Sequence, residues 1–180
     1  MGNKSNYMEM MQVYKESRML FLDSVINTDV AKYTIETLLY YDTDEKHAPI
    51  SMYINSPGGS VPDGFAIIDT MELIKSPINT YVVGRAYSMA AMIAIAGNDR
   101  KATKRSIFMF HEPSYGHDFE KISRIKDSEK YLHRVEELMK ELLESKTKLK
   151  YNQLTFGADL YFYGEELIEK GIVSEIISQE

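Results

Sequence analysis

The sequence predicts an α/β fold in which a mostly parallel sheet is covered by helices. Short apolar runs alternate along the chain with segments whose apolar residues recur at helical spacing, and this alternation is typical of βαβ units. The chain has 180 residues, of which 44% are hydrophobic and 27% are charged, the balance of a globular protein. Its length suits one hydrophobic core, and the sequence contains no internal repeat, low-complexity tract or linker. We therefore expect a single domain over residues 1–180, with residues 1–17 as a short N-terminal segment.

Five apolar runs are predicted to be strands, because each is short and is bounded by polar or turn-forming residues. They cover residues 19–22, 50–54, 80–83, 107–110 and 172–177. The second run leads into a Pro-Gly-Gly turn, and the third leads into Gly84. Glycines in such places permit a sharp turn and a close approach of the backbone.

Three segments between these runs are predicted to be helices from the spacing of their apolar residues. They cover residues 30–41, 65–74 and 89–96. In the second segment, we expect the inward side chains to be Phe65, Ile68, Met71 and Leu73. The third segment is apolar nearly all round, so we expect it to be buried.

The stretch 119–149 predicts a long amphipathic helix. Its apolar stripe comprises Leu132, Val135, Leu138, Met139, Leu142 and Leu143. Glutamates and lysines occupy the other face. Such a helix can lie on the sheet with one face in solvent, or it can project as an arm that packs on a symmetry mate. Its length exceeds what a crossover needs, which favours the projecting arm.

The composition excludes several classes of protein. The chain has no cysteine, which rules out disulfides, thiolate catalysis and zinc–thiolate sites and suits a reducing cytoplasm. A net charge of -6 provides no basic face for nucleic acid. Residues 1–9 are polar and lack the apolar core of a signal peptide. The longest apolar stretch, 89–96, is far shorter than the roughly 20 residues that cross a bilayer. We expect a cytoplasmic protein without nucleic-acid or membrane partners.

Ser88 is the first candidate for chemistry, because it stands between a strand that ends near Gly84 and the apolar helix 89–96. A serine at this position is most often an N-cap of the helix. The same position also exposes a hydroxyl beside unpaired backbone N–H groups and at the positive end of the helix dipole. That arrangement suits a nucleophile whose attack creates an oxyanion. Both interpretations are open at this point.

Three further positions allow both a structural and a functional interpretation. The turn Pro57-Gly58-Gly59 is either a plain tight turn or a place where free N–H groups approach a ligand. His111 ends the strand 107–110, and the ends of strands often carry site residues in α/β folds. Asp159 precedes an aromatic segment, where it can also cap a turn. Weaker candidates are the histidines in polar loops or in the long helix, namely His47, His117 and His133.

The motifs around these positions occur together, and in this order, in one known family. They are Tyr53-Ile54-Asn55-Ser56-Pro57-Gly58-Gly59, Ile68-Asp69-Thr70-Met71, Ser88-Met89-Ala90-Ala91, His111-Glu112-Pro113, and Asp159 followed by Gly171-Ile172-Val173. With these motifs the chain resembles the proteolytic subunit of the Clp protease, from about residue 18 to residue 177. The Asn-Ser-Pro-Gly-Gly turn followed by Ser-Met is the most specific part. The order Ser, His, Asp also differs from the Ser, Asp, His order of α/β-hydrolases.

The resemblance implies a fold, an activity and partners. The fold is the one shared by Clp peptidases and crotonases, with repeated ββα-type units and a handle region over about residues 114–150 whose long helix interlocks two rings. The activity is that of an ATP-independent serine endopeptidase core, which hydrolyses unfolded proteins or peptides through an acyl-enzyme and needs no metal or cofactor. The assembly is two stacked seven-membered rings of identical subunits, and the partner is an AAA+ unfoldase that feeds substrate into them.

The same resemblance assigns roles residue by residue. Ser88 is the nucleophile, His111 is the general base and Asp159 orients the histidine, a set in which the imidazole titrates near neutral pH and the carboxylate fixes its tautomer. The backbone roles are the oxyanion hole, formed by Gly59 and Met89, and the binding of an extended substrate strand, beside Gly58, Ser60 and Val61.

Three departures from the family pattern concern partners rather than chemistry. The segment before Tyr14 is short and rich in methionine, where the family has a long axial loop that meets the unfoldase. Ser51 replaces an aromatic residue of the unfoldase docking pocket, although Tyr53 remains. Ala158 stands where many members have an arginine for contacts between rings. These departures count against the usual unfoldase docking and ring switching, and they are typical of a divergent or phage-encoded member.

Three other functions stay open. A crotonase-like acyl-CoA enzyme would share the fold and the oxyanion hole, but it does not need the Ser-His-Asp set, and the sequence has no basic cluster directed at CoA. A non-catalytic subunit of a Clp ring would not need the set either. A phage head-maturation peptidase would have a related fold. The complete set of three side chains favours the Clp-type peptidase.

Overall fold

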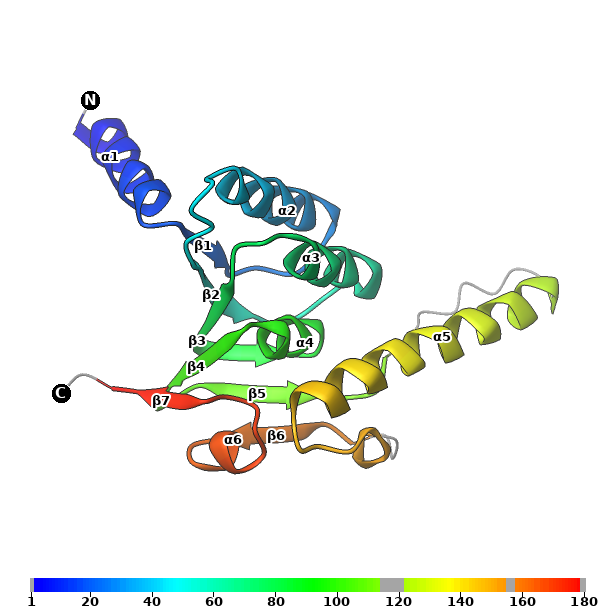
Figure 1. Ribbon diagram of the computed structural model, residues 1–180. Coiled ribbons are helices and arrows are strands. Elements are labelled where there is room, and N and C mark those ends of the chain that lie inside the picture. Colours follow the sequence, from blue (N-terminus) through cyan, green and yellow to red (C-terminus); the bar gives the residue numbers. More distant parts are fainter. Residues whose placement is uncertain (1, 114–121, 155–157, 179–180) are drawn as a thin grey trace.

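The computed structural model describes residues 2–113, 122–154 and 158–178, which form a mixed α/β fold around one sheet (Figure 1). The predicted fold class is confirmed, since the sheet is mostly parallel and helices cover it. His117, and residues 119–121 at the start of the predicted long helix, lie outside the described residues.

The sheet has seven strands in the order β1-β2-β3-β4-β7, with β5 pairing with the far end of β3 and β6 pairing with β5. Their bounds are β1 (Met19–Leu22), β2 (Ile50–Ser56), β3 (Ile78–Tyr87), β4 (Asp99–Thr103), β5 (Ile107–Phe110), β6 (Leu160–Tyr163) and β7 (Glu175–Ile177). Every pair is parallel except β5–β6, which is antiparallel. This last pairing brings the chain after residue 157 back beside the end of β5.

The long strand β3 changes partner halfway along. Its first half, from Asn79 to Val82, pairs with β4, whereas Arg85 to Tyr87 pair with β5. Between the two halves the register with β2 shifts, and Gly84 takes a positive φ of 99°. The bend is therefore built around the glycine, and it directs the end of β3, just before Ser88, toward the end of β5.

Three helices cover one face of the sheet, namely α2 (Thr28–Asp42), α3 (Val61–Leu73) and α4 (Met89–Ala96) (Figure 1). All eight residues of α4 are buried, as its apolar sequence predicts. Alanines and Gly97 let α4 approach β3 closely, because a Cβ on Gly97 would lie 2.6 Å from the Thr80 hydroxyl oxygen. The apolar core therefore lies between these three helices and the strands beneath them.

Helix α5 (Ile122–Lys146) projects away from the sheet at its N-terminal end, while its C-terminal half packs against α4 (Figure 1). Four residues of the predicted apolar stripe are buried in that half: Val135, Met139, Leu142 and Leu143. The predicted long helix is therefore confirmed over 122–146, where it ends at Lys146 rather than at residue 149, and its amphipathic pattern is confirmed from residue 129 onward. The remaining helical elements are α1 (Gly2–Glu16), η1 (Tyr151–Gln153) and α6 (Glu166–Glu169).

Several details of the sequence prediction were wrong or incomplete. Leu73 is 78% exposed because it is the last residue of α3, and Ile67 is buried in the helix instead. Strand β7 begins at Glu175 rather than at residue 172. Ile172 and Val173 are buried, but they lie before the strand. The sequence prediction also missed α1, β4, β6 and the short α6.

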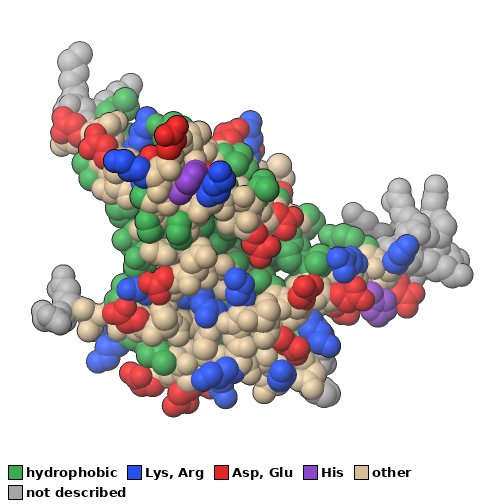
Figure 2. Space-filling view, in the orientation of Figure 1, with side chains coloured by type: hydrophobic (Ala, Val, Ile, Leu, Met, Phe, Trp, Pro, Cys, Tyr) green, Lys and Arg blue, Asp and Glu red, His purple; other side chains and the backbone are tan. Residues whose placement is uncertain are grey.

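Acidic and basic side chains are interspersed over the face of the molecule seen in Figure 2, where neither sign gathers into a continuous patch of described residues. Within the described parts of the chain, every helix is too short or too polar to cross a membrane.

Candidate active site

Ser88 occupies the sharp turn between β3 and α4, with φ 53° and ψ -125°. A positive φ is uncommon for a residue with a side chain, and it costs about 1–3 kcal/mol where the surrounding structure enforces it. Ser88 holds the N-cap position of α4, yet its side chain makes no capping hydrogen bond. Its Oγ lies 2.7 Å from Nε2 of His111 instead. Of the two interpretations of this serine, the geometry therefore disfavours the plain N-cap.

His111 reaches Ser88 because of the pairing between β3 and β5. Tyr87 is in register with Met109, and the Ser88 N–H donates to the Met109 carbonyl at 2.8 Å. His111 follows β5 directly, so its half-buried ring stands beside the serine. A neutral imidazole with Nε2 unprotonated would accept the hydroxyl proton at this distance.

The Gly58-Gly59 turn packs directly against the Ser88 turn. A Cβ built on Gly58 would lie 2.5 Å from the Tyr87 carbonyl oxygen and 2.8 Å from the Ser88 Cβ. Both glycines have positive φ, 89° for Gly58 and 152° for Gly59. Glycine is therefore required at residue 58 by the close approach as well as by the backbone conformation.

Hydrogen bonds fix this turn against the segment after β1. The Ile26 N–H donates to the Gly58 carbonyl and the Ser60 N–H donates to the Ile26 carbonyl, both at 2.9 Å. These two hydrogen bonds pair Ile26 with Gly59 as in a parallel sheet, and they leave the Gly59 N–H unused. Met89 begins α4, so its N–H has no acceptor within the helix. Two backbone donors are thus available close to Ser88.

Ser60 and Val61 continue from the turn into α3. The Ser60 hydroxyl accepts a hydrogen bond from the Asp63 N–H at 3.4 Å, and Val61 is the first residue of the helix. Gly58 is buried, whereas Gly59 is exposed and Ser60 and Val61 are partly exposed. The chain from Gly59 to Val61 is therefore accessible beside the serine turn.

Asp159 is exposed and lies one residue before β6. In the antiparallel register Phe110 faces Leu160, so the next pair beyond the ladder is His111 and Asp159. The carboxylate nevertheless accepts a hydrogen bond from the Tyr161 hydroxyl at 3.3 Å. Among the described residues it forms neither a hydrogen bond nor an ion pair with His111. The structure thus brings two of the three predicted side chains together and leaves the third beside them.

Comparison with known proteins decides the family. The sequence model of the family described as Clp protease matches residues 2–180. The chain belongs to the Clp protease family. It is 34% identical over 165 residues to the ATP-dependent Clp protease proteolytic subunit 3 of Synechococcus sp. (strain CC9605), which covers 89% of this chain and 82% of that protein. It is 32% identical over 181 residues to the proteolytic subunit 2 of Prochlorococcus marinus (strain MIT 9312), covering 97% and 89% respectively. The chain is accordingly a Clp-type peptidase core, and its general class is that of the serine peptidases.

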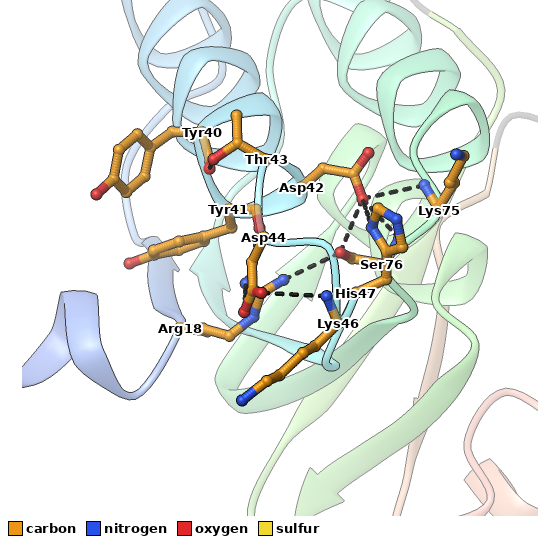
Figure 3. A network of polar contacts seen from close by, with 10 residues as sticks. All are labelled: Arg18, Tyr40, Tyr41, Asp42, Thr43, Asp44, Lys46, His47, Lys75 and Ser76. Atoms are coloured by element: carbon orange, nitrogen blue, oxygen red, sulfur yellow. Dashed lines mark hydrogen bonds and ion pairs between the residues drawn. The ribbon is translucent and has the colours of Figure 1, made fainter.

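Two of the other histidines lie in structural contacts away from this Clp-family site. His47 approaches Asp42 with Nδ1 at 3.1 Å, in a polar network that joins the end of α2 to the loop before β3 (Figure 3). His133 lies on exposed α5, 3.6 Å from Glu136. Within the described residues, histidines and carboxylates do not cluster in a way that would hold a metal ion. His111 is therefore the histidine that the fold places beside Ser88.

Sequence reasoning missed one residue of the site, Tyr161. Its ring meets the Tyr87 ring edge-on, with the centroids 6.0 Å apart and an interplanar angle of 89°. Partial burial, and then the charge of Asp159, raise the pKa of the Tyr161 hydroxyl, which favours its role as a donor. The run of consecutive aromatic residues Tyr161-Phe162-Tyr163 after Asp159 was a signal for a strand, and that strand would have placed Tyr161 on the same face as Asp159.

Proposed function

We propose that the chain hydrolyses peptide bonds with Ser88 as nucleophile and His111 as general base. The observation that carries the proposal is the 2.7 Å contact between Ser88 Oγ and His111 Nε2, made by a serine in a strained strand-to-helix turn. As Oγ attacks the scissile carbonyl carbon, His111 takes the hydroxyl proton. It then returns that proton to the leaving amine, and an acyl-enzyme forms. Water, activated by the same imidazole, releases the acyl group.

Asp159 completes the set in this proposal. Asp159 and His111 would form the next opposed pair, one step beyond the last pair of the β5–β6 ladder, and directly opposed residues of antiparallel strands have Cβ atoms about 4.5–5.5 Å apart. Rotation of its side chain away from Tyr161 would bring the carboxylate to the imidazole Nδ1–H. There it would fix the tautomer and stabilise the imidazolium that forms during attack.

The oxyanion is proposed to be stabilised by the backbone N–H groups of Gly59 and Met89. Met89 N lies 3.1 Å from the position of a Cβ on Gly58, so the two donor segments converge. The removal of one such donor typically lowers kcat by about 10²–10³. The exposed chain at Gly59, Ser60 and Val61 is proposed to pair with an extended substrate strand, as the edge of a sheet does in other peptide complexes.

For assembly, we propose two stacked heptameric rings of this chain, fed by an AAA+ unfoldase. The relatives are named as subunits of ATP-dependent proteases. The projecting half of α5 suits an interlocking handle between rings (Figure 1). For docking, Tyr53 stacks between Phe21 and Tyr81 at 5.4 and 5.0 Å, although Ser51 supplies no ring on the same strand. We expect weaker unfoldase docking than a pocket with both aromatic residues would give.

The test is labelling of the native assembly with a fluorophosphonate probe, together with hydrolysis of a fluorogenic peptide. We expect labelling at Ser88, no labelling of Ser88→Ala, and strongly reduced labelling of His111→Ala. His47→Ala is the matched control, because it removes a histidine of a polar network away from Ser88 and should leave both rates unchanged. Native mass spectrometry of the same samples reports the assembly.

Failure to label the fully assembled protein would contradict the proposal. It would favour a non-catalytic ring subunit, which would restore activity only when mixed with an active subunit. Acyl-CoA turnover that survives Ser88→Ala would favour crotonase-like chemistry. Cleavage confined to a co-expressed scaffold protein would favour a head-maturation peptidase.

A further inference from the structure

We propose that Tyr161 is a positioning residue that holds the Asp159 carboxylate away from His111, so that the triad is completed when this hydrogen bond breaks. The inference rests on the proposed function, because it concerns the same three side chains. Its starting observation is the hydrogen bond from the Tyr161 hydroxyl to Asp159 Oδ2 at 3.3 Å, where the carboxylate of a complete triad would contact the imidazole.

The register of β5 and β6 makes Tyr161 and His111 alternative partners of the same carboxylate. Residues 159 and 161 point to one face of their strand, because side chains alternate along a strand. Met109 faces Tyr161, and the next position on that face of β5 is His111. Asp159 thus has the imidazole across from it and the phenol two residues along its own strand. One rotation of its side chain exchanges one partner for the other.

The position of the phenol is fixed by the strand that carries the nucleophile. The Tyr161 ring packs edge-on against Tyr87, the residue just before Ser88, with 6.0 Å between centroids. The Arg85 guanidinium lies 5.7 Å from the other ring of this pair, that of Tyr87. Tyr87, Met109 and Tyr161 form one row across β3, β5 and β6. A change in the Ser88 turn therefore reaches the phenol through a single ring contact.

Both members of the hydrogen bond are accessible, and this makes the contact breakable. Tyr161 is 49% exposed, and Asp159 is exposed as well. A hydrogen bond open to water contributes little net stability, so a small change in the surroundings is enough to shift the side chain. A bound peptide beside Ser88, or a neighbouring subunit packed on β6, would supply such a change.

The test variant is Tyr161→Phe, which removes the hydroxyl and keeps the ring against Tyr87. We expect kcat for a fluorogenic peptide and the rate of fluorophosphonate labelling to rise about two- to fivefold, the population shift that follows from losing one water-exposed hydrogen bond, with KM unchanged. Tyr163→Phe is the matched control, since it removes the next hydroxyl on the same face of β6 and should leave kcat as it is.

A double-mutant cycle shows whether Tyr161 acts through Asp159. In the Asp159→Asn background, Tyr161→Phe should leave the residual kcat unchanged, because the carboxylate that it positions is gone. Equal rates for Tyr161→Phe and the unaltered protein would overturn the proposal. So would a change that persists in the Asp159→Asn background, since it would show a purely structural role. If Ser88→Ala or His111→Ala retains full activity, the proposed function fails, whatever Tyr161→Phe does.

Discussion

Gly58→Ala tests the packing of the glycine turn on Ser88 most directly. The new Cβ would lie 2.5 Å from the Tyr87 carbonyl oxygen, 2.8 Å from the Ser88 Cβ and 3.1 Å from the Met89 nitrogen. Two of these atoms are backbone and the third is fixed to it, so no flexible side chain can move aside. The φ of 89° adds a conformational cost of about 1–2 kcal/mol for any residue with a Cβ.

A matched variant separates the two costs. Gly164→Ala carries the conformational cost without the clash, because Gly164 has φ 59° and no atom lies within 4 Å of its built Cβ. We expect Gly164→Ala to lower the free energy of unfolding by about 1 kcal/mol and to leave activity unchanged. We expect overpacking to lower the free energy of unfolding of Gly58→Ala by a further ~1–3 kcal/mol. The clash should displace Ser88 by about 1 Å, and such a displacement should lower the kcat of Gly58→Ala about 10²-fold.

Urea denaturation gives the two unfolding free energies, and peptide hydrolysis by the native assembly gives kcat. The two variants must be compared as assemblies with the same number of subunits, which native mass spectrometry measures. If Gly58→Ala were as stable as Gly164→Ala and retained full activity, the close approach between the turn and Ser88 would be wrong.

Two further predictions concern pH and backbone strain. Burial by itself would raise the pKa of Asp42, but hydrogen bonds from Ser76, the Lys75 N–H and His47 outweigh it and lower the pKa to about 2 (Figure 3). Because the folded pKa lies below the unfolded value, this stabilisation is present above about pH 4 and is lost as the pH falls toward 2. The shift corresponds to about 1–2 kcal/mol after allowance for a side chain that is 20% exposed. Urea denaturation at pH 6 and pH 3 should therefore show a smaller loss for Asp42→Asn than for the unaltered protein, and an equal loss would contradict the assignment. Ser88→Gly should unfold with a free energy about 1 kcal/mol greater than that of Ser88→Ala, because glycine tolerates φ 53° and alanine keeps the strain, and both variants should be inactive. The reverse order of stability would show that the turn is unstrained.

The elements whose bounds were predicted residue for residue are those whose apolar composition allows only one secondary structure. Helix α4 is apolar on all sides, and β1 and β5 are short apolar runs between polar residues, so their bounds agree with the sequence prediction. Strand β4 was missed because it begins Asp-Arg-Lys and buries only Ala102 fully. Its place in the sheet is decided by tertiary pairing with β3 and β7 rather than by its own side chains.

At the site, too, the features with a local sequence pattern were predicted, whereas the feature that depends on tertiary contacts was not. A serine before an apolar helix, a histidine at a strand end and a double glycine all have local signatures, and the fold joins them. Whether Asp159 contacts His111 or Tyr161 depends on one side-chain rotation in the β5–β6 pair, and no local pattern determines it. Helix α1 was missed for a related reason, since its sequence is polar with scattered methionines and has no strong apolar face.

The positive φ angles of the site are concentrated where the most buried helix begins, and of these residues only Ser88 carries a side chain and is therefore strained. Gly58, Gly59 and Ser88 all have positive φ, and they meet at the N-terminal end of α4. Burial of a Met or Ile side chain contributes about 1.5–3 kcal/mol, so Met89, Met92, Ile93 and Ile95 of α4 together outweigh the strain of about 1–3 kcal/mol at Ser88. The wholly apolar sequence of α4 therefore stabilises the strained turn at Ser88. It holds the partly exposed Ser88 and the Met89 N–H in a conformation that a weakly packed helix would abandon for an ordinary N-cap.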